Sequence, residues 1–420
     1  MREGMAGFED EIVVNRRRLL AWISASPLLA SSAATFSADN RAAGIEPITA
    51  PTVPPTLITD PKQAINVFDF EPVARSVLPP AHYGYMATGV EDDATLRANR
   101  EAFGKIQLRP RRLVDVSRVD MSVELFGEKW ETPIALAPTG SHKMLFHEGE
   151  LATARAARAR KHLQILSNMS TTSVEAVNQA RGTPVWFQLY ATNSWEVASA
   201  LAMRAEAAGC PVLTLTVDRL AGRNIETFER YKRLDTRNCA SCHDSGLQQS
   251  VKRKPNWDGI NLAGLRSLQS SNLSWDFVRR LRDATRMKVV LKGILTADDA
   301  RLAVQAGVDG IIVSNHGGRS EENGRGTIEA LPEVLEGAGG RLPVLIDSGF
   351  RRGTDIVKAM AMGASGICIG RPYLWALASF GQPGVERVLE ILRTELEVAM
   401  KQYGVRSLRE LNPSFIRRAV

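Results

Sequence analysis

Residues 288–314 of the chain read KVVLKGILTADDARLAVQAGVDGIIVS. This stretch opens with a short β-branched run, Lys288–Lys292, and closes with another, Gly310–Ser314. Between them, Ala297–Ala306 is rich in alanine and places apolar residues three and four apart, which is typical of an amphipathic helix. A strand, a helix and a second strand in this order predict two parallel strands joined by a right-handed crossover.

The same alternation continues along most of the chain. Six further short apolar runs between turn residues are predicted as strands: Pro133–Ala137, Leu163–Ser167, Val185–Tyr190, Val212–Val217, Pro343–Asp347 and Gly366–Gly370. Eight such units predict a closed (β/α)8 barrel of the TIM type, an α/β fold whose functional residues lie at the carboxyl ends of its strands. An open doubly wound sheet is disfavoured because no Gly-x-Gly-x-x-Gly turn follows the first strand.

The spacing of the strands indicates the domain organisation. About 70 residues separate the fourth strand from the fifth, so we expect a long insertion at 219–272. The globular pattern begins near residue 63, which predicts a helical N-terminal segment ahead of the barrel and a barrel domain spanning 63–420.

The N-terminal part of the chain does not show a globular pattern. Arg16 and Arg17 precede an apolar run rich in Ala and Ser, Ala21–Ala34, which is short for a membrane span. This layout predicts a twin-arginine export signal at 1–38 and a periplasmic protein; the alternatives are an uncleaved membrane anchor and an amphipathic or disordered end. Residues 39–62 are rich in proline and are expected to form an extended linker.

Composition excludes several classes of protein. With 44% hydrophobic and 24% charged residues the chain resembles ordinary globular proteins, and four cysteines are too few for a disulfide scaffold. The net charge of +7 is only mildly basic and no nucleic-acid-binding motif accompanies it, so we expect no nucleic-acid partner.

Polar and glycine residues gather where the predicted strands end. They follow all eight strands: Pro138, Thr139 and Gly140; Ser167; Gln188 and Tyr190; Thr216 and Asp218; Lys292; Ser314; Asp347 and Gly349; and Gly370. An ordinary turn explains any one of them, but eight strand ends together predict a functional rim.

Three features of this rim point to specific chemistry. Glycines followed by Arg351 and Arg371 after the last two strands favour a phosphate site, because backbone N–H groups and guanidinium groups bind phosphate. Lys292, at the end of a buried strand, suits either a Schiff base or a fixed cation beside an electron-rich ring. His316 is flanked by glycines and open to a ligand, and Asp218 is suited to orient it.

The motifs resemble those of the FMN-dependent 2-hydroxy acid dehydrogenases and oxidases, which include glycolate oxidase, lactate oxidase, mandelate dehydrogenase and flavocytochrome b2. The resemblance runs from about Ile65 to Leu411. It rests on Ser-Asn-His-Gly-Gly-Arg (314–319), Lys292-Gly293, Thr216-Val217-Asp218, Phe187-Gln188-Leu189-Tyr190, and Asp347, Gly349 and Arg351 with Gly370-Arg371. It implies FMN at the barrel mouth, with its phosphate on the loops after strands seven and eight.

The resemblance also implies roles for individual residues. The flavin and its ribityl chain and phosphate would contact Pro138, Thr139, Gly140, Ser167, Gln188, Thr216, Lys292, Ser314, Asp347, Gly349, Arg351, Gly370 and Arg371. His316, oriented by Asp218, would remove a proton from a small 2-hydroxy acid while two electrons pass to the flavin, which leaves a 2-oxo acid. Arg319 and Tyr85 would hold the substrate carboxylate, and Tyr190 would bond the substrate oxygen.

One departure from the family pattern affects substrate binding. The family usually has Gly-x-Arg after Thr-Val-Asp, whereas this chain has Gly222-Arg223-Asn224. Either the loop shifts by one residue and Arg223 takes the place of that arginine, or carboxylate binding relies on Arg319 and Tyr85.

Several electron acceptors are compatible with the resemblance. Gly140 falls where oxidases of the family tend to have alanine and several dehydrogenases glycine, which favours transfer to a cytochrome or quinone. The alternatives are an oxidase that forms hydrogen peroxide and a non-catalytic flavin or haem electron carrier. The complete set of His316, Lys292 and Arg319 argues against the carrier. By analogy with its relatives the protein is expected to be a homo-oligomer.

The insertion contains a possible second cofactor site, Cys239-Ala240-Ser241-Cys242-His243. Cys-x-x-Cys-His is the attachment string for c-type haem, in which Cys239 and Cys242 bind the vinyl groups and His243 ligates the iron. Export agrees with this interpretation because c-type haem is attached outside the cytoplasm. A Cys239–Cys242 disulfide and a loop without a ligand are the other two interpretations.

Overall fold

The computed structural model describes residues 57–237 and 247–418. The compact unit begins at Leu57, so the last residues of the expected linker, 57–62, belong to it. The predicted export signal, the rest of the linker and the predicted haem residues Cys239, Cys242 and His243 lie outside the described residues.

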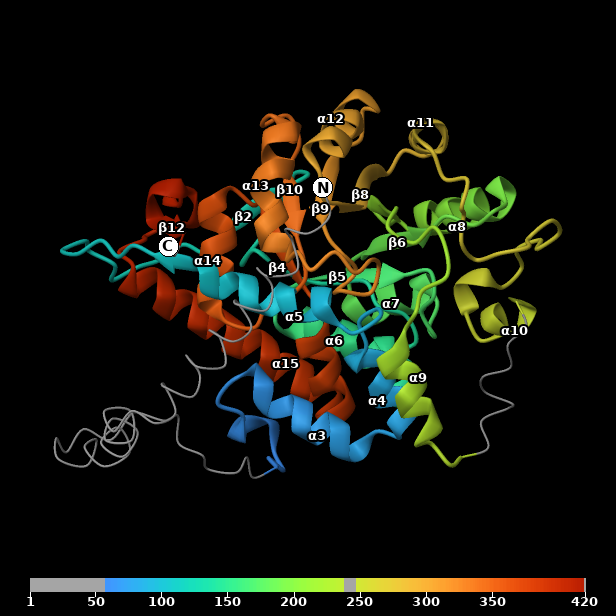
Figure 1. Ribbon diagram of the computed structural model, residues 1–420, viewed down its shortest axis with the longest axis horizontal. Coiled ribbons are helices and arrows are strands. Elements are labelled where there is room, and N and C mark those ends of the chain that lie inside the picture. The colour runs from blue at the N-terminus through green and yellow to red at the C-terminus, as the bar shows by residue number, and fades with distance from the viewer. Residues whose placement is uncertain (1–56, 238–246, 419–420) are drawn as a thin grey trace, which may run out of the picture. The chain divides into compact units, whose positions relative to one another are not determined.

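Eight parallel strands form a closed barrel in the order β10-β11-β4-β5-β6-β7-β8-β9, with helices around it (Figure 1). The strands are β4 (Ile134–Leu136), β5 (Leu163–Ser167), β6 (Trp186–Tyr190), β7 (Val212–Thr216), β8 (Lys288–Ile294), β9 (Gly310–Val313), β10 (Val344–Ile346) and β11 (Gly366–Ile369). Each lies in one of the predicted runs, and β8 extends its run by two residues. The predicted (β/α)8 barrel is confirmed.

One helix follows each barrel strand, and the helix predicted over Ala297–Ala306 ends one residue earlier than expected. These helices are α6 (Glu150–Ala159), α7 (Val174–Arg181), α8 (Trp195–Ala207), α11 (Trp275–Ala284), α12 (Ala297–Gln305), α13 (Thr327–Ala338), α14 (Gly353–Met362) and α15 (Arg371–Gln402). The last is bent at Gly381, whose φ of 62° is not helical.

The helical N-terminal segment and the insertion after the fourth barrel strand are both present. The segment consists of α3 (Phe70–Val77), α4 (Pro80–Ala87) and α5 (Ala94–Glu101), and the described part of the insertion contains α9 (Glu226–Arg233) and α10 (Leu247–Lys252). Short 3-10 helices occur at Pro61–Gln63, Val67–Asp69, Ala102–Lys105, His142–Met144, Pro255–Trp257, Leu408–Glu410 and Pro413–Phe415.

Two small antiparallel sheets were not predicted. β1 (Ile106–Leu108) pairs with β12 (Ile416–Arg418), and β2 (Val123–Leu125) pairs with β3 (Glu128–Trp130). Strands of three residues are too short to show a period of two in the sequence.

The hairpin of β2 and β3 closes the amino end of the barrel. The Trp186 ring lies 5.4 Å from the ring of Trp130 and 5.4 Å from that of Phe126. Inward-facing side chains at this end are apolar, including Ile165, Val290, Ile312 and Leu345. Because strand side chains alternate, the inward positions two residues further along are Ser167, Lys292, Ser314 and Asp347. The same strands therefore give the barrel an apolar floor and a polar mouth.

No helix in the described ranges is both long and apolar enough to cross a membrane. Within the same ranges no group of three or more His, Cys, Asp or Glu side chains is arranged to hold a metal ion.

Candidate functional site

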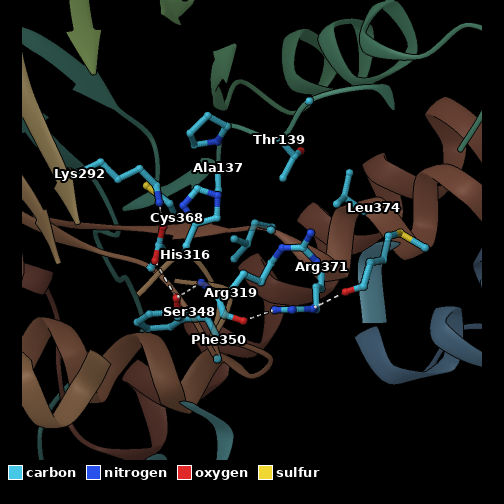
Figure 2. A pocket seen from close by; sticks show the side chains of 18 of the residues that line it. Ala137, Thr139, Lys292, His316, Arg319, Ser348, Phe350, Cys368, Arg371 and Leu374 are labelled. Atoms are coloured by element: carbon cyan, nitrogen blue, oxygen red, sulfur yellow. Dashed lines mark hydrogen bonds and ion pairs between the residues drawn. The ribbon is translucent and has the colours of Figure 1, made fainter. Parts of the chain in front are cut away.

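A cavity with an empty volume of about 790 Å³ opens at the carboxyl ends of the barrel strands. Figure 2 shows side chains that line it, among them Lys292, His316, Arg319 and Arg371. The residues proposed from the sequence that line it are Tyr85, Pro138, Thr139, Gly140, Tyr190, Lys292, His316, Arg319, Asp347, Gly349, Arg351, Gly370 and Arg371.

His316 lies between two groups that orient its ring. Its Nδ1 atom is 2.8 Å from Oδ1 of Asp218, and its Nε2 atom is 3.1 Å from the hydroxyl oxygen of Tyr190. Burial lowers the pKa of His316 below the ordinary value of 6.5, although the Asp218 carboxylate acts in the opposite direction. The ring is therefore neutral at neutral pH, with Nδ1–H donating to Asp218 and Nε2 able to accept a proton.

The turn that carries His316 has a backbone conformation that its neighbours enforce. The φ angle of His316 is 59°, in the left-handed region that residues other than glycine rarely adopt. The side-chain amides of Asn315 and Asn99 donate to each other at 2.8 and 2.9 Å, and Asn315 Oδ1 also accepts from the N–H of Gly318 at 2.9 Å. Enforced conformations of this kind are typical of functional sites.

Replacing Asp218 with asparagine is expected to lower kcat by about 10²–10⁴-fold, because the charge that stabilises the imidazolium and fixes its tautomer is lost. The wild-type acid limb of kcat/KM should lie below the ordinary histidine pKa of 6.5, since the base must be neutral. The Asp218 carboxylate raises the pKa of His316, so its removal should move that limb to lower pH. A pH–rate profile checks both expectations. A shift of the limb to higher pH would show that Asp218 does not act on His316.

Lys292 places a fixed positive charge at the inner end of the cavity. Its Nζ atom lies 3.0 Å from a carboxylate oxygen of Asp347 and donates to Ser314 Oγ at 2.7 Å. Burial acts to lower the pKa of Lys292, but the carboxylates of Asp347 and Asp218 outweigh it and the pKa is raised. The group stays charged, which favours the fixed cation over the Schiff base, because a Schiff base requires a neutral amine.

Arg351 and Arg371 are partly buried cations, and neither forms an ion pair with an acidic side chain of the described residues. Arg351 donates to the carbonyl oxygen of Phe350 at 2.9 Å and stacks 4.8 Å from the Trp375 ring. Arg371 donates to three backbone carbonyl groups. Burial lowers the pKa of Arg351 to about 10 and that of Arg371 to about 9. A phosphate dianion is the kind of partner that compensates both charges.

The backbone beside these arginines also suits a phosphate. Gly370 lines the cavity, and a Cβ atom at this position would meet nothing within 4 Å, so its backbone faces open space. Helix α15 begins at Arg371, and the first N–H groups of a helix are unpaired and attract anions. Gly349 has a φ of 83°, and a Cβ atom there would collide with the carbonyl oxygen of Asn99. These donors fit the phosphate of FMN.

Four of the proposed cofactor residues lie in the buried layer of the barrel and do not line the cavity: Ser167, Gln188, Thr216 and Ser314. Gln188 Nε2 donates to Thr216 Oγ1 at 2.9 Å, while Gln188 Oε1 is buried without a hydrogen-bond partner among the described residues. A buried acceptor left unpaired is costly. A ligand with a ring N–H donor, as a flavin has, fits this position.

The substrate side of the cavity contains Tyr85, Arg319 and, behind it, Arg223. The guanidinium carbon of Arg319 lies 4.8 Å from the centre of the Tyr85 ring, and Arg319 donates to the carbonyl oxygen of Thr88 at 3.1 Å. Arg223 does not line this cavity but donates to the carbonyl oxygen of Arg319 at 2.6 Å. Because Arg223 does not line the cavity, this placement agrees with the interpretation in which carboxylate binding relies on Arg319 and Tyr85.

Sequence reasoning missed several residues that line the cavity, among them Ser348, Phe350, Cys368 and Leu374. Ser348 Oγ donates to Asp347 Oδ1 at 2.8 Å and accepts from the N–H of Gly317 at 3.1 Å. It thereby joins the loop after β10 to the turn that carries His316. Ser348 could have been identified from its position in the chain, because it lies between Asp347 and Gly349, which were both proposed as cofactor-binding residues.

A buried network behind the loop after β4 was missed as well. His142 Nε2 lies 2.8 Å from Oγ1 of Thr139, which lines the cavity, and the backbone N–H of His142 donates to Oε1 of Glu150 at 3.0 Å. Glu150 is fully buried and also accepts from the backbone N–H of Thr171 at 2.8 Å and from its hydroxyl at 2.7 Å. This carboxylate ties the loops after β4 and β5 together.

Comparisons with known proteins agree with the geometry of the cavity. The chain matches the family of FMN-dependent dehydrogenases over residues 74–418. It is 43% identical over 364 residues to glycolate oxidase 3 from Oryza sativa subsp. indica, with 84% of this chain and 95% of that protein covered. The identity to glycolate oxidase from Spinacia oleracea is 42% over 364 residues, with the same 84% and 95% covered.

Solved structures show the same similarity. A soluble mutant of the membrane-associated (S)-mandelate dehydrogenase from Pseudomonas putida has a TM-score of 0.77 and 34% identity, with 84% of this chain and 99% of that chain covered. A mutant flavocytochrome b2 with pyruvate bound has a TM-score of 0.74 and 31% identity, with 85% and 87% covered.

Proposed function

The chain belongs to the family of FMN-dependent dehydrogenases and is an FMN-dependent 2-hydroxy acid oxidoreductase, and on this premise we propose that it works as a dehydrogenase. It oxidises a small 2-hydroxy acid to the 2-oxo acid, and the electrons pass on to a cytochrome or a quinone. The oxidation itself is carried by the position of His316, a neutral base oriented by Asp218 at a cavity that Lys292 and Arg319 also line. The choice of acceptor rests on Gly140 and on the predicted export signal.

Each residue at the cavity has a separate role in the reaction. FMN, when bound, accepts the two electrons of the oxidation. Arg319 binds the substrate carboxylate and orients the reacting carbon. His316 takes the proton at Nε2, and Asp218 stabilises the imidazolium that results. Lys292 keeps a positive charge at the inner end of the cavity, where the negative charge of a reduced ring is stabilised.

Tyr190 is placed to donate a hydrogen bond to the substrate oxygen while the 2-hydroxy acid becomes a 2-oxo acid. The Tyr190 hydroxyl group is within hydrogen-bond reach of His316 Nε2. It therefore lies close enough to donate to the substrate oxygen as that oxygen loses its proton to His316. Burial raises the pKa of Tyr190, and the phenol therefore remains a hydrogen-bond donor throughout.

Turnover of a 2-hydroxy acid is expected to be faster with an artificial electron acceptor under anaerobic conditions than with oxygen. Two sequence features support this expectation, the glycine at position 140 and the predicted export signal, which would send the protein to a compartment with respiratory partners. The measurement compares dye reduction with oxygen consumption and peroxide formation. Oxygen consumption as fast as dye reduction, with one peroxide per 2-oxo acid, would show an oxidase.

The segment at 239–243 and the export signal lead to two further tests. Expression in a host able to mature cytochromes c, followed by a visible spectrum, separates the interpretations of Cys239, Cys242 and His243. A Soret band would establish haem, and its absence would leave the disulfide or the loop without a ligand.

We propose that the protein is exported folded. Fractionation of cells should then place it in the periplasm, and replacing Arg16 and Arg17 with lysine should retain it in the cytoplasm.

A further inference from the structure

The loop after β4 forms part of the cavity wall, and Figure 2 shows two of its residues, Ala137 and Thr139. Pro138 and Gly140 line the cavity as well. Proline has no N–H group, and the N–H groups of Thr139 and Gly140 donate to no acceptor among the described residues. Backbone donors are normally paired. The loop therefore offers two N–H groups to a ligand in the cavity.

Tyr373 holds this loop from the start of α15, the helix that begins at Arg371. Its side chain is buried, and its hydroxyl group donates to the carbonyl oxygen of Ala137 at 2.8 Å. A carbonyl oxygen only accepts, so the single hydroxyl proton of Tyr373 is used there. Tyr373 Oη also contacts Oγ1 of Thr139. Thr139 must therefore be the donor in that second contact.

His142 is the next member of this network. Its Nε2 atom lies 2.8 Å from Thr139 Oγ1 and 3.4 Å from Tyr373 Oη. Because the protons of both hydroxyl groups are already donated elsewhere, Nε2 carries the ring proton and is the donor. Nδ1 then accepts from the hydroxyl group of Thr153 at 3.2 Å. This arrangement needs a neutral ring, and burial lowers the pKa of His142 below its ordinary value of 6.5.

The turn that follows the loop is fixed by three further parts of the chain. Ser141 has a φ angle of 64°, in the left-handed region, and its N–H donates to the carbonyl oxygen of Met169 at 3.2 Å. Its hydroxyl oxygen accepts from Lys254 of the insertion, and the backbone N–H of His142 donates to Glu150. Such a backbone conformation persists only where its surroundings enforce it. These contacts therefore hold the loop in one conformation.

Fixed N–H donors affect the two oxidation states of a flavin differently. Two-electron reduction adds negative charge to the ring, and hydrogen-bond donors stabilise that charge more than they stabilise the neutral oxidised ring. Donors that are already in position need no reorganisation when the charge develops, and exclusion of water strengthens their effect. A loop whose N–H groups were free to turn would lose this preference for the reduced ring.

We propose that Tyr373 and His142 are positioning residues for the flavin. Through Ala137 and Thr139 they hold the N–H groups of Thr139 and Gly140 as donors to the ring, and thereby favour its reduced form. This inference rests on the FMN-binding part of the proposed function, but not on the identity of the acid or of the electron acceptor.

The first test replaces Tyr373 with phenylalanine, which removes one hydroxyl group and keeps the ring. The midpoint potential of the flavin in the FMN-loaded protein, measured by reductive titration beside a reference dye, needs no substrate. We expect reduced FMN to bind about tenfold more weakly relative to oxidised FMN, which lowers the two-electron potential by about 30 mV. Tyr83→Phe is the matched control, because Tyr83 is also buried and donates to Glu71 at 3.1 Å but does not line the cavity. Its potential should equal that of the wild type.

The second test uses two variants of His142 and keeps the inference testable if Tyr373→Phe binds no FMN. His142→Gln retains an N–H donor for Thr139, so its potential should stay near that of the wild type. His142→Leu has no donor, and its potential should fall about as far as that of Tyr373→Phe. Recovery by glutamine would show that the hydrogen bond to Thr139 is what acts on the flavin.

Three results would overturn the inference. The first is an unchanged potential in Tyr373→Phe or His142→Leu, which would leave these residues a structural role only, even with a lower free energy of unfolding. The second is an equal fall in Tyr83→Phe. The third is an equal fall in both His142 variants.

The outcomes also separate this inference from the proposed function. If the potentials shift as expected but no 2-hydroxy acid reduces the wild-type flavin, the inference stands and the proposed function fails. If an acid reduces the flavin and the potentials do not shift, the proposed function stands and the inference fails.

Discussion

Replacing His316 with alanine is expected to slow flavin reduction by a 2-hydroxy acid about 10²–10⁴-fold. The physical reason is the loss of the proton acceptor, because His316 Nε2 is the neutral basic nitrogen at the cavity and Asp218 holds its ring in place. FMN should remain bound, since Lys292, Arg351 and Arg371 are unchanged. Anaerobic rapid mixing of the FMN-loaded variant with substrate measures the rate, and the visible spectrum measures the retained flavin.

His147→Ala is the control for this substitution. His147 is exposed and does not line the cavity, and the centre of its ring lies 4.4 Å from that of Phe146. This variant should reduce flavin at the wild-type rate. If His316→Ala also did so with FMN bound, another group would be the base and the assignment of His316 would be wrong.

Replacing Arg351 with methionine is expected to weaken FMN binding by about 1.5–3 kcal/mol, which corresponds to a roughly 10- to 150-fold rise in Kd. Arg351 is a partly buried cation that stacks on Trp375 and forms no ion pair within residues 57–237 and 247–418. Without FMN the unpaired charge of Arg351 therefore destabilises the apoprotein. Methionine removes this charge and retains an apolar side chain of similar length. The free energy of unfolding of the apoprotein should stay the same or rise.

Two titrations test this expectation. Binding of FMN by apoprotein, followed by flavin fluorescence, measures Kd, and denaturant unfolding of the apoprotein measures stability. Arg118→Met, a change at an exposed arginine, should alter neither quantity. An unchanged Kd in Arg351→Met would place the phosphate elsewhere, whereas a large loss of apoprotein stability would show that Arg351 is a structural residue.

The barrel was predictable because its signal is local. Each strand is a short apolar run and each helix a periodic segment, so no contact between distant residues was needed to recognise a unit such as 288–314. The position of the site followed from the same signal, because all parallel strands of a barrel end at one rim. This is why Lys292, Asp347 and Gly370 could be assigned to one cavity although they are far apart in the chain.

Features that depend on tertiary contacts were not predictable. Asn99 supports the turn of His316 from 216 positions away, and no periodicity in the sequence links the two asparagines. Tyr85 reaches the cavity from α4 and was found only through the family resemblance. The position of Arg219 against the Tyr190 ring depends on how the insertion leaves β7, which its sequence does not show. The short sheets of β1 with β12 and of β2 with β3 were also missed, because strands of three residues carry no recognisable pattern of their own.

The most direct test of the central claim is anaerobic addition of 2-hydroxy acids, with one and with two carboxylates, to the FMN-loaded protein. The account predicts that at least one acid bleaches the visible flavin absorbance and that one 2-oxo acid forms per flavin. If no acid bleaches a flavin that dithionite reduces readily, then His316, Lys292 and Arg319 do not form a 2-hydroxy acid oxidation site.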